Sequence, residues 1–205
     1  MYVETPANPN NALFNIEMIS EVAKEFETKN KKQVVTAVDN TYMGPIWQHP
    51  LNIGADLTIY SATKYLGGHS DLIAGAVMGN QDLMNRVKVL RTFLGNMISP
   101  NTAWLMLRSL ETLKLRMDKQ CENAKKVAQF LTTHDKIEKV YYLGLLQDGD
   151  KGFDIYKKQC TQPGAMISFD IRGKEKDAFT FLNHLKLIKL AVSLGSTESL
   201  AQHPS

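Results

Sequence analysis

The chain has 205 residues, of which 43% are hydrophobic, 22% charged and 8% aromatic, ordinary values for a globular protein. Its formal net charge of +3 is too small to indicate a nucleic-acid partner or an acidic membrane surface. The longest stretch without a strongly polar side chain, residues 72–79, is far below the ~18 residues that span a bilayer. Composition therefore excludes a disordered, collagen-like or disulfide-stapled chain, and neither nucleic acid nor a membrane is expected as a partner.

The two ends of the chain suggest a larger protein. Residues 1–4 have the pattern of a buried strand, and the segment Thr5-Pro6-Ala7-Asn8-Pro9 follows at once. A strand at the extreme start needs neighbouring strands, and no targeting signal, polar tail or first helix precedes it. The last residues, 203–205, stop without a closing element. We therefore expect the chain to be a fragment.

The first part of the chain alternates helix and strand patterns. Apolar residues recur at helical spacing near residues 15–29, which predicts an amphipathic helix. Short apolar or β-branched runs typical of buried strands lie at residues 33–39, 56–60 and 74–78. Short apolar strands separated by helices indicate a mostly parallel α/β sheet.

From residue 101 the pattern changes. Residues 103–133 contain no Gly or Pro and repeat apolar residues at helical spacing, which predicts one long helix of the kind that often joins two lobes. Beyond it follow apolar runs at 139–143 and 166–171 with a loop rich in Gly and Asp between them, a helix near 175–185 and an apolar run at 187–194. We therefore expect two domains, residues 1–115 built on the α/β sheet and residues 116–205 with a smaller α+β pattern.

Several common sites are absent from the sequence. Cys121 and Cys160 are widely spaced, and we interpret them as unpaired thiols of a protein in a reducing compartment. Gly68-His69-Ser70 begins like the nucleophile elbow of hydrolases, but Leu72 stands where the second glycine belongs. Neither a GxxxxGKS/T phosphate loop nor a GxGxxG fingerprint occurs. The five histidines are scattered, so no metal site is expected.

Candidate chemistry gathers at the ends of two expected strands. Asp39 directly follows a buried run, at the edge where open α/β sheets bind ligands, although an isolated Asp could equally cap the next turn. The next strand ends in Ser61-Ala62-Thr63-Lys64, followed by a pair of glycines. Hydroxyls and backbone N–H groups suit a phosphate, and a partly desolvated lysine is suited to form a Schiff base. The alternative is that Lys64 is a solvated surface charge.

These residues resemble the pyridoxal phosphate (PLP) signature of the Cys/Met-metabolism enzymes, the family of cystathionine γ-synthase, the cystathionine lyases and methionine γ-lyase. The blocks that carry the resemblance are, in chain order, Tyr2-x-Glu4-Thr5-Pro6-Ala7-Asn8-Pro9, Asp39-Asn40-Thr41, Gln48-x-Pro50-Leu51-x-x-Gly54-Ala55-Asp56, Ser61-Ala62-Thr63-Lys64-Tyr65-x-x-Gly68-His69-Ser70-Asp71, Arg116-Met117, Asn123-Ala124, Gln159, Gly164-Ala165-Met166-x-Ser168-Phe169 and Ser193-Leu194-Gly195-x-x-Glu198-Ser199-Leu200. The chain departs from the family pattern at Tyr60, Gly44 and Leu143, none of which bears chemistry.

The resemblance implies the PLP-dependent transferase fold of type I, as in aspartate aminotransferase, with a truncated PLP-binding domain at residues 1–115. It implies that Lys64 is the catalytic residue, holding the cofactor as a Schiff base and then moving protons on the substrate. Asp39, with Thr41 beside it, would hold the pyridinium nitrogen protonated, and Ser61 and Thr63 would donate to the phosphate.

By the same resemblance, Asn8 would contact the cofactor's phenolic oxygen or the substrate carboxylate, and Ser193 would help hold that carboxylate. The family's phosphate loop, stacking tyrosine and the residues lent by a neighbouring subunit would precede residue 1, and its carboxylate-binding arginine would follow residue 205. The complete protein would be a homotetramer of catalytic dimers. The aromatic and Met residues between 42 and 47 are interpreted as an interface loop or, alternatively, as core.

The implied activity is PLP-dependent cleavage of a sulfur amino acid in the cytoplasm. We expect α,γ-elimination of methionine to a thiol, 2-oxobutanoate and ammonia, because residues 2–10, 97–100 and 191–204 look more like methionine γ-lyases than synthases. The alternatives are a cystathionine γ-synthase or lyase, an O-acylhomoserine sulfhydrylase that performs γ-replacement, and an inactive fragment of such an enzyme.

Overall fold

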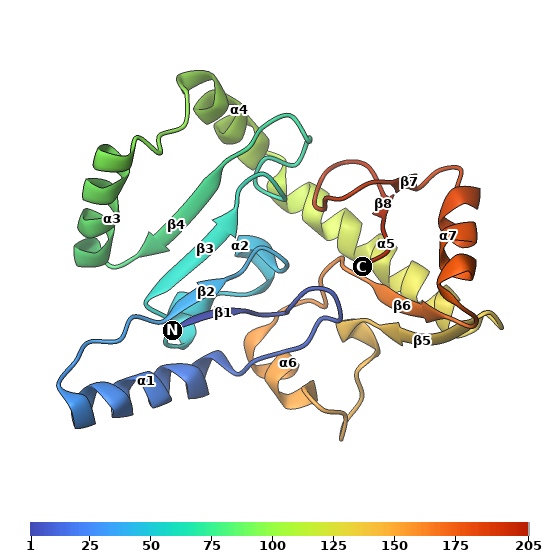
Figure 1. Ribbon diagram of the computed structural model, residues 1–205, viewed down its shortest axis with the longest axis horizontal. Coiled ribbons are helices and arrows are strands. Elements are labelled where there is room, and N and C mark those ends of the chain that lie inside the picture. Colours follow the sequence, from blue (N-terminus) through green and yellow to red (C-terminus); the bar gives the residue numbers. More distant parts are fainter. Residues whose placement is uncertain (205) are drawn as a thin grey trace.

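The computed structural model describes residues 1–204, and its first feature is a four-stranded sheet (Figure 1). The strands lie in the order β1 (Tyr2–Glu4), β2 (Ala37–Asp39), β3 (Leu57–Ser61) and β4 (Gly75–Gly79). β1, β2 and β3 are parallel, and β4 runs antiparallel to β3. The expected mostly parallel sheet is therefore present. Its first strand is an edge strand rather than the buried one expected, because β1 pairs only with β2 and 65% of Tyr2 is exposed.

Helices connect these strands. The expected first helix is α1 (Ile16–Asn30), and a short α2 (Gly44–Trp47) follows β2. After β4 comes α3 (Gln81–Leu94), which was not among the expected helices. Its apolar residues Leu83, Val87, Leu90 and Leu94 do recur at helical spacing, although only Leu83 is buried.

The single long helix expected over residues 103–133 is wrong in one respect: it is two helices, α4 (Pro100–Leu110) and α5 (Leu113–Thr132). The interruption lies at residues 111–112. There the carbonyl of Ser109 accepts from the Arg116 guanidinium (2.9 Å), which caps the end of α4 with a side chain. A break made by a side chain leaves no Gly or Pro signal in the sequence.

The later part of the chain contains two small sheets. β5 (Ile137–Tyr141) and β6 (Ser168–Ile171) pair antiparallel beside α5, and β7 (Lys189–Leu190) and β8 (Leu200–Ala201) form a short parallel pair. The expected helix near 175–185 is α7 (Glu175–His184). Two expectations need correction: the Gly- and Asp-rich loop contains α6 (Phe153–Gln159), and the apolar run at 187–194 supplies only the two strand residues of β7.

The main core lies between the sheet, α2 and α5, and it corrects the interpretation of residues 42–47 as an interface loop. Tyr42, Met43 and Trp47 are all buried. Trp47 meets Tyr65 edge to face, with ring centroids 5.7 Å apart, and Met117 of α5 belongs to the same cluster. The alternative, burial in the core, therefore holds for this segment.

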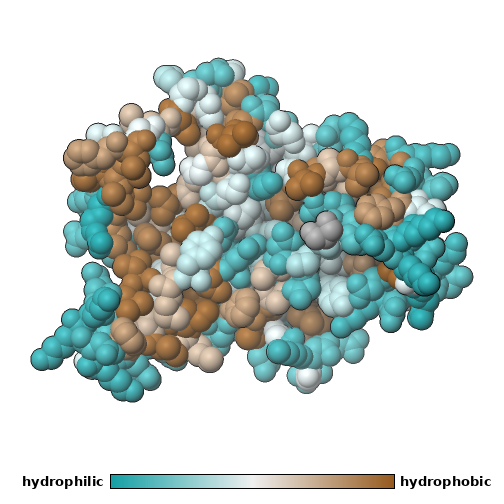
Figure 2. Space-filling model, viewed as in Figure 1, coloured by the Kyte–Doolittle hydropathy of each residue, from teal (hydrophilic) through white to brown (hydrophobic). Residues whose placement is uncertain are grey.

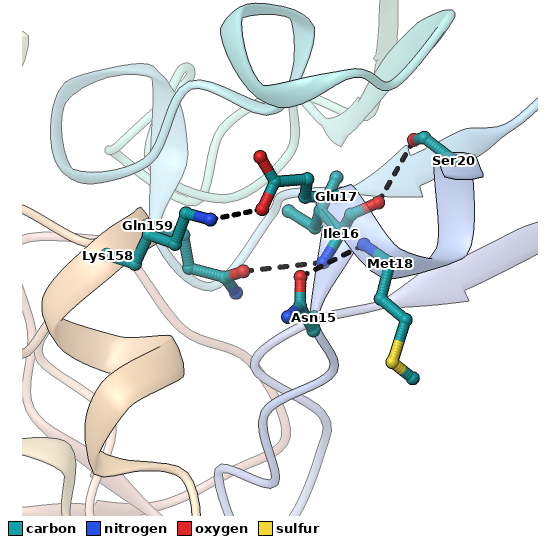
Figure 3. A network of polar contacts seen from close by, with 7 residues as sticks. All are labelled: Asn15, Ile16, Glu17, Met18, Ser20, Lys158 and Gln159. Atoms are coloured by element: carbon teal, nitrogen blue, oxygen red, sulfur yellow. Dashed lines mark hydrogen bonds and ion pairs between the residues drawn. The ribbon is translucent and has the colours of Figure 1, made fainter. Parts of the chain in front are cut away.

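The start of α1 is joined to the end of α6, as Figure 3 shows. The Asn15 side chain caps α1 by accepting from the Met18 N–H (3.1 Å), and the Gln159 amide oxygen accepts from the Ile16 N–H (3.4 Å). Lys158 and Glu17 form an ion pair across the junction. The polar contacts therefore fasten α6 to the helix that packs on the sheet.

Two general properties follow from the described residues. Among residues 1–204, no helix combines the length and the hydrophobicity needed to cross a membrane. Cys121 and Cys160 are both free thiols, as expected.

Candidate active site

The carboxyl ends of the parallel strands bring three acidic or basic side chains to one edge of the sheet. Glu4 ends β1, Asp39 ends β2, and the two residues are paired in register. Lys64 follows the end of β3 by three residues. Open α/β sheets bind their ligands at this edge, so the topology places the predicted chemistry where a ligand site is expected.

The two carboxylate oxygens of Asp39 have different partners. Oδ1 accepts from the Thr41 backbone N–H (3.0 Å) and from the Thr41 hydroxyl (2.6 Å), so Asp39 does cap the next turn. Oδ2 accepts from the Tyr2 hydroxyl (2.8 Å). The Thr41 Oγ1 in turn accepts from the Ser61 N–H (2.8 Å), which joins the end of β2 to the end of β3. The carboxylate is therefore held in a fixed orientation.

Burial and neighbouring carboxylates make this edge unfavourable for additional negative charge. Burial and the neighbouring Asp39 charge raise the pKa of Glu4 above its ordinary value. Burial, together with the hydrogen bond to Asp39, raises the pKa of Tyr2 to about 12, and burial with the Glu4 charge raises that of Tyr42 to about 12. Each of these shifts reports a site that resists additional negative charge. A protonated ring nitrogen beside Asp39 would offset it.

Lys64 is half-buried and hydrogen-bonded, which distinguishes it from a solvated surface charge. Its Nζ lies 3.2 Å from the Ser193 Oγ and donates to it, although the two residues are 129 positions apart. The turn that carries Lys64 is closed by its own N–H donating to the Ser61 carbonyl (3.0 Å) and by the Gly68 N–H donating to the Lys64 carbonyl (2.7 Å). The structure thus brings the predicted catalytic residue and a predicted substrate-binding residue together.

The remaining predicted residues differ in how they are placed. The Ser61 hydroxyl has no hydrogen-bond partner within residues 1–204. The Thr63 hydroxyl is occupied, because it donates to the Ala74 carbonyl (3.3 Å) and accepts from the Ala74 N–H (3.1 Å). Asn8 is exposed in a loop that a bond between Ala7 N–H and the Ala12 carbonyl closes, and no hydrogen bond joins its side chain to the other predicted residues.

Sequence reasoning assigned no role to two residues that shape the site. Tyr2 donates to Asp39, a contact that the strand pairing of β1 with β2 makes possible. Gly195 lies so close to the Lys64 turn that an added Cβ would be 2.6 Å from the Tyr65 N atom. A side chain would not fit there, so glycine is required. The sequence signal for this close approach was the glycine itself, two residues after Ser193.

This donor set fits PLP on chemical grounds. A half-buried amine (Lys64) suits the cofactor's aldehyde, and a held carboxylate (Asp39) suits its ring nitrogen. The open Ser61 hydroxyl at the end of a strand suits its phosphate. The Thr63 hydroxyl would first have to leave the Ala74 carbonyl.

Comparison with known proteins gives a consistent result. The model of the family described as Cys/Met metabolism PLP-dependent enzyme matches residues 1–205. L-methionine gamma-lyases of Fusobacterium nucleatum subsp. polymorphum and Pseudomonas putida are 44% and 42% identical over 207 residues, covering 100% of this chain and 51% and 50% of those proteins. Cystathionine gamma-lyase of Sus scrofa is 42% identical over 206 residues, covering 100% of this chain and 49% of that protein. The chain thus spans about half the length of the curated relatives it matches.

Solved structures agree with this likeness. A cystathionine gamma synthase from Xanthomonas oryzae pv. oryzae, in complex with aminoacrylate and cysteine, superposes with a TM-score of 0.92 at 37% identity, covering 99% of this chain and 51% of that one. A cystathionine gamma-lyase from Lactobacillus plantarum complexed with L-serine gives a TM-score of 0.90 at 36% identity, with the same coverage.

Proposed function

Since the chain belongs to the Cys/Met metabolism family of PLP-dependent enzymes and has its type I α/β fold, as expected, we propose that the protein containing it cleaves carbon–sulfur bonds of sulfur amino acids. The observation that carries the proposal is the contact of the Lys64 amine with the Ser193 hydroxyl at the sheet edge that also bears Asp39. The substrate is proposed to be methionine, cleaved by α,γ-elimination. Six relatives named L-methionine gamma-lyase, at 41–44% identity, support that choice.

A second candidate is a cystathionine lyase or a γ-replacement enzyme. It is favoured by relatives named cystathionine gamma-lyase and cystathionine beta-lyase, at 42% and 40% identity. The TM-score of 0.92 with a cystathionine gamma synthase favours it as well. Both candidates use the same cofactor and the same lysine, and they differ in what happens to the substrate after proton removal.

Bound PLP supplies an electron sink for the electrons released at the substrate Cα. In this proposal Lys64 would be the residue that holds the cofactor, and its Nζ, when free, would move protons at the substrate Cα and Cβ. The hydrogen bond to Ser193 orients that amine. Asp39 keeps the ring nitrogen protonated, and Thr41 keeps the Asp39 carboxylate in place.

The supporting residues have simpler proposed roles. Ser61 donates to the cofactor phosphate with its open hydroxyl, and Thr63 joins it by exchanging its bond to Ala74. Ser193 also helps hold the substrate carboxylate. Asn8 contacts the cofactor's phenolic oxygen or that carboxylate from its exposed loop.

We also propose how the whole protein is organised. The chain divides into a cofactor domain, residues 1–115, and a smaller domain, residues 116–205. The protein is a homotetramer, which is supported by large apolar side chains exposed on α3 and α4, namely Val89, Leu90, Phe93, Leu94, Trp104 and Leu107. Figure 2 shows hydrophobic side chains gathered over α3 and the sheet. A cytoplasmic location is supported by the two free thiols.

The central experiment tests Lys64 in the protein expressed from the complete reading frame that contains this chain. With PLP the protein is expected to be yellow, and borohydride is expected to attach the cofactor to Lys64 alone, as mass spectrometry of peptides would show. Lys64→Ala should abolish turnover and leave the melting temperature nearly unchanged, because a half-buried lysine with one hydroxyl contact contributes little to stability. Lys24→Ala, on the exposed face of α1, is the matched control and should behave as wild type.

The substrate is tested in the same preparation. Release of a thiol and 2-oxobutanoate from methionine without an added thiol supports elimination. Turnover only with cystathionine, or only with an O-acylhomoserine and a thiol, supports the second candidate. Attachment of the cofactor to another lysine, or full activity in Lys64→Ala, contradicts both.

A further inference from the structure

One face of α5 holds both of the loops that meet at the Lys64–Ser193 contact. Arg116 and Gln120 are four residues apart and therefore point from the same side of the helix. The Arg116 guanidinium donates to the Tyr65 carbonyl (3.0 Å), in the turn that carries Lys64. The Gln120 side-chain amide donates to the Ser196 carbonyl (2.9 Å), in the loop that carries Ser193.

The Arg116 guanidinium fits closely against the turn that carries Lys64. Its three nitrogen atoms are used on the Tyr65 carbonyl, the Ser109 carbonyl and the Thr112 hydroxyl (3.1 Å). The guanidinium also lies directly against Gly68, where an added Cβ would be 2.0 Å from Nη1. Burial lowers the pKa of Arg116, so the turn is packed onto a partly desolvated, planar donor.

The Ser193 loop has few other attachments. Within residues 1–204, the hydrogen bonds that join residues 193–196 to other elements are Lys64 Nζ to Ser193 Oγ and Gln120 Nε2 to Ser196 O. Gly195 rests on the backbone of the Lys64 turn without a hydrogen bond. If Gln120 is removed, the position of Ser193 depends on the lysine contact and on packing alone.

We propose that Gln120 and Arg116 are positioning residues of the reaction: α5 fixes the Ser193 hydroxyl and the Lys64 amine relative to each other through two adjacent turns of one helix. This inference rests on the proposed function. Gln120 acts through Ser193 and therefore on substrate binding, whereas Arg116 acts through the Lys64 turn and therefore on the chemical step. Misplacing a reacting group by about 1 Å can cost as much as ~100-fold in rate.

The sharpest test is a double-mutant cycle in the PLP-loaded protein from the complete reading frame. Gln120→Ala is expected to lower kcat/KM for the substrate about tenfold, mainly through KM, because the displaced hydroxyl no longer holds the substrate carboxylate. In a Ser193→Ala background the same substitution should have little further effect, since residues in one network are not additive. Arg116→Lys, which keeps the charge but lacks the planar fork that reaches the Tyr65 and Ser109 carbonyls together, should lower kcat and leave KM nearly unchanged.

Two further variants separate positioning from simple stabilisation. Gln120→Glu has the same shape but cannot donate when ionised, so it should reproduce the KM effect of Gln120→Ala. Gln129→Ala, on an exposed turn of the same helix, should match wild type. The visible absorbance of the bound cofactor gives a readout that does not depend on turnover. Its pH dependence should shift in Gln120→Ala in the same direction as in Ser193→Ala.

The outcomes distinguish this inference from the function on which it rests. If borohydride does not attach the cofactor to Lys64 in wild type, the proposed function fails first. If that attachment occurs but Gln120→Ala acts fully additively with Ser193→Ala, or matches Gln129→Ala, the positioning role alone is wrong. A variant that melts lower but keeps wild-type KM also contradicts it.

Discussion

At the scale of single residues, one glycine of the site lies directly against the backbone of a second loop. Gly195 has φ +78°, and a Cβ on it would be 2.6 Å from the Tyr65 N atom and 3.0 Å from the Lys64 carbonyl carbon. Both neighbours are backbone atoms of the turn that carries Lys64, the proposed catalytic residue, so they cannot rotate away as a side chain could. Any side chain at position 195 must move one of the two loops.

Gly195→Ala is therefore expected to lower kcat/KM at least tenfold, by separating Ser193 from Lys64. Gly95→Ala is the matched control, because Gly95 has a similar φ of +74° but nothing within 4 Å of an added Cβ. Gly95→Ala places a side chain on the same left-handed backbone conformation, but its Cβ does not collide with another loop. Steady-state kinetics and melting temperatures of the two variants measure the difference, and equal activities would show that the two loops need not touch.

The residues of the site differ in how far they could be predicted. Asp39 and Lys64 are visible in the sequence because each follows a recognisable strand, and strand ends are where ligands bind. Ser193 could be assigned only by family resemblance, since its contact with Lys64 spans 129 positions. Gln120 bonds a backbone carbonyl of a distant loop, and no spacing rule signals such a contact.

At the scale of elements, α1 shows how a local signal and a distant contact combine at one helix end. The Asn15 side chain satisfies the Met18 N–H, and Gln159 satisfies the Ile16 N–H (Figure 3). The first of these is an ordinary N-cap that the sequence itself contains. The second arrives from α6, which sequence periodicity did not reveal.

Asn15→Ala is expected to lower the free energy of unfolding by about 1 kcal/mol, the typical cost of removing an N-cap. Asn15→Ser should restore most of the loss, because a serine hydroxyl can accept from the same N–H. Urea denaturation followed by circular dichroism measures both. If the alanine variant is as stable as wild type, the Gln159 contact is enough to hold the helix start.

The elements missing from the expectations differ in the signal they carry. α3 has apolar residues at helical spacing although only Leu83 is buried, whereas α6 has 7 residues and buries only Gln159. The break between α4 and α5 depends on the Arg116 side chain capping Ser109. A side-chain cap of this kind is invisible to hydrophobic periodicity, which records only the spacing of apolar residues.

At the scale of the whole molecule, burial of neutral acids links the fold to pH. Burial raises the pKa of the Cys160 thiol to about 12, and burial with the Glu4 charge raises the pKa of the Tyr42 phenol to about 12. In the unfolded chain a thiol titrates at about 8.5 and a phenol at about 10. Between those values and about 12 the folded state holds more protons than the unfolded state, so the free energy of unfolding falls as pH rises.

Cys160 is the first of these groups to matter, because its unfolded-state value is the lowest. Its Sγ donates to the Gln48 side-chain oxygen (3.3 Å), inside the amide network that joins the core to α6. Cys160→Ser preserves a hydroxyl donor to Gln48, and a serine hydroxyl does not titrate in this pH range.

The Cys160→Ser variant is therefore expected to lose less stability than wild type between about pH 8 and pH 10. Urea denaturation of both proteins across that range measures how steeply the free energy of unfolding falls with pH. Burial also raises the pKa of the Cys121 thiol, so Cys121→Ser is a parallel case. Equal slopes in wild type and Cys160→Ser would mean that the thiol ionises in the folded state as readily as in the unfolded chain.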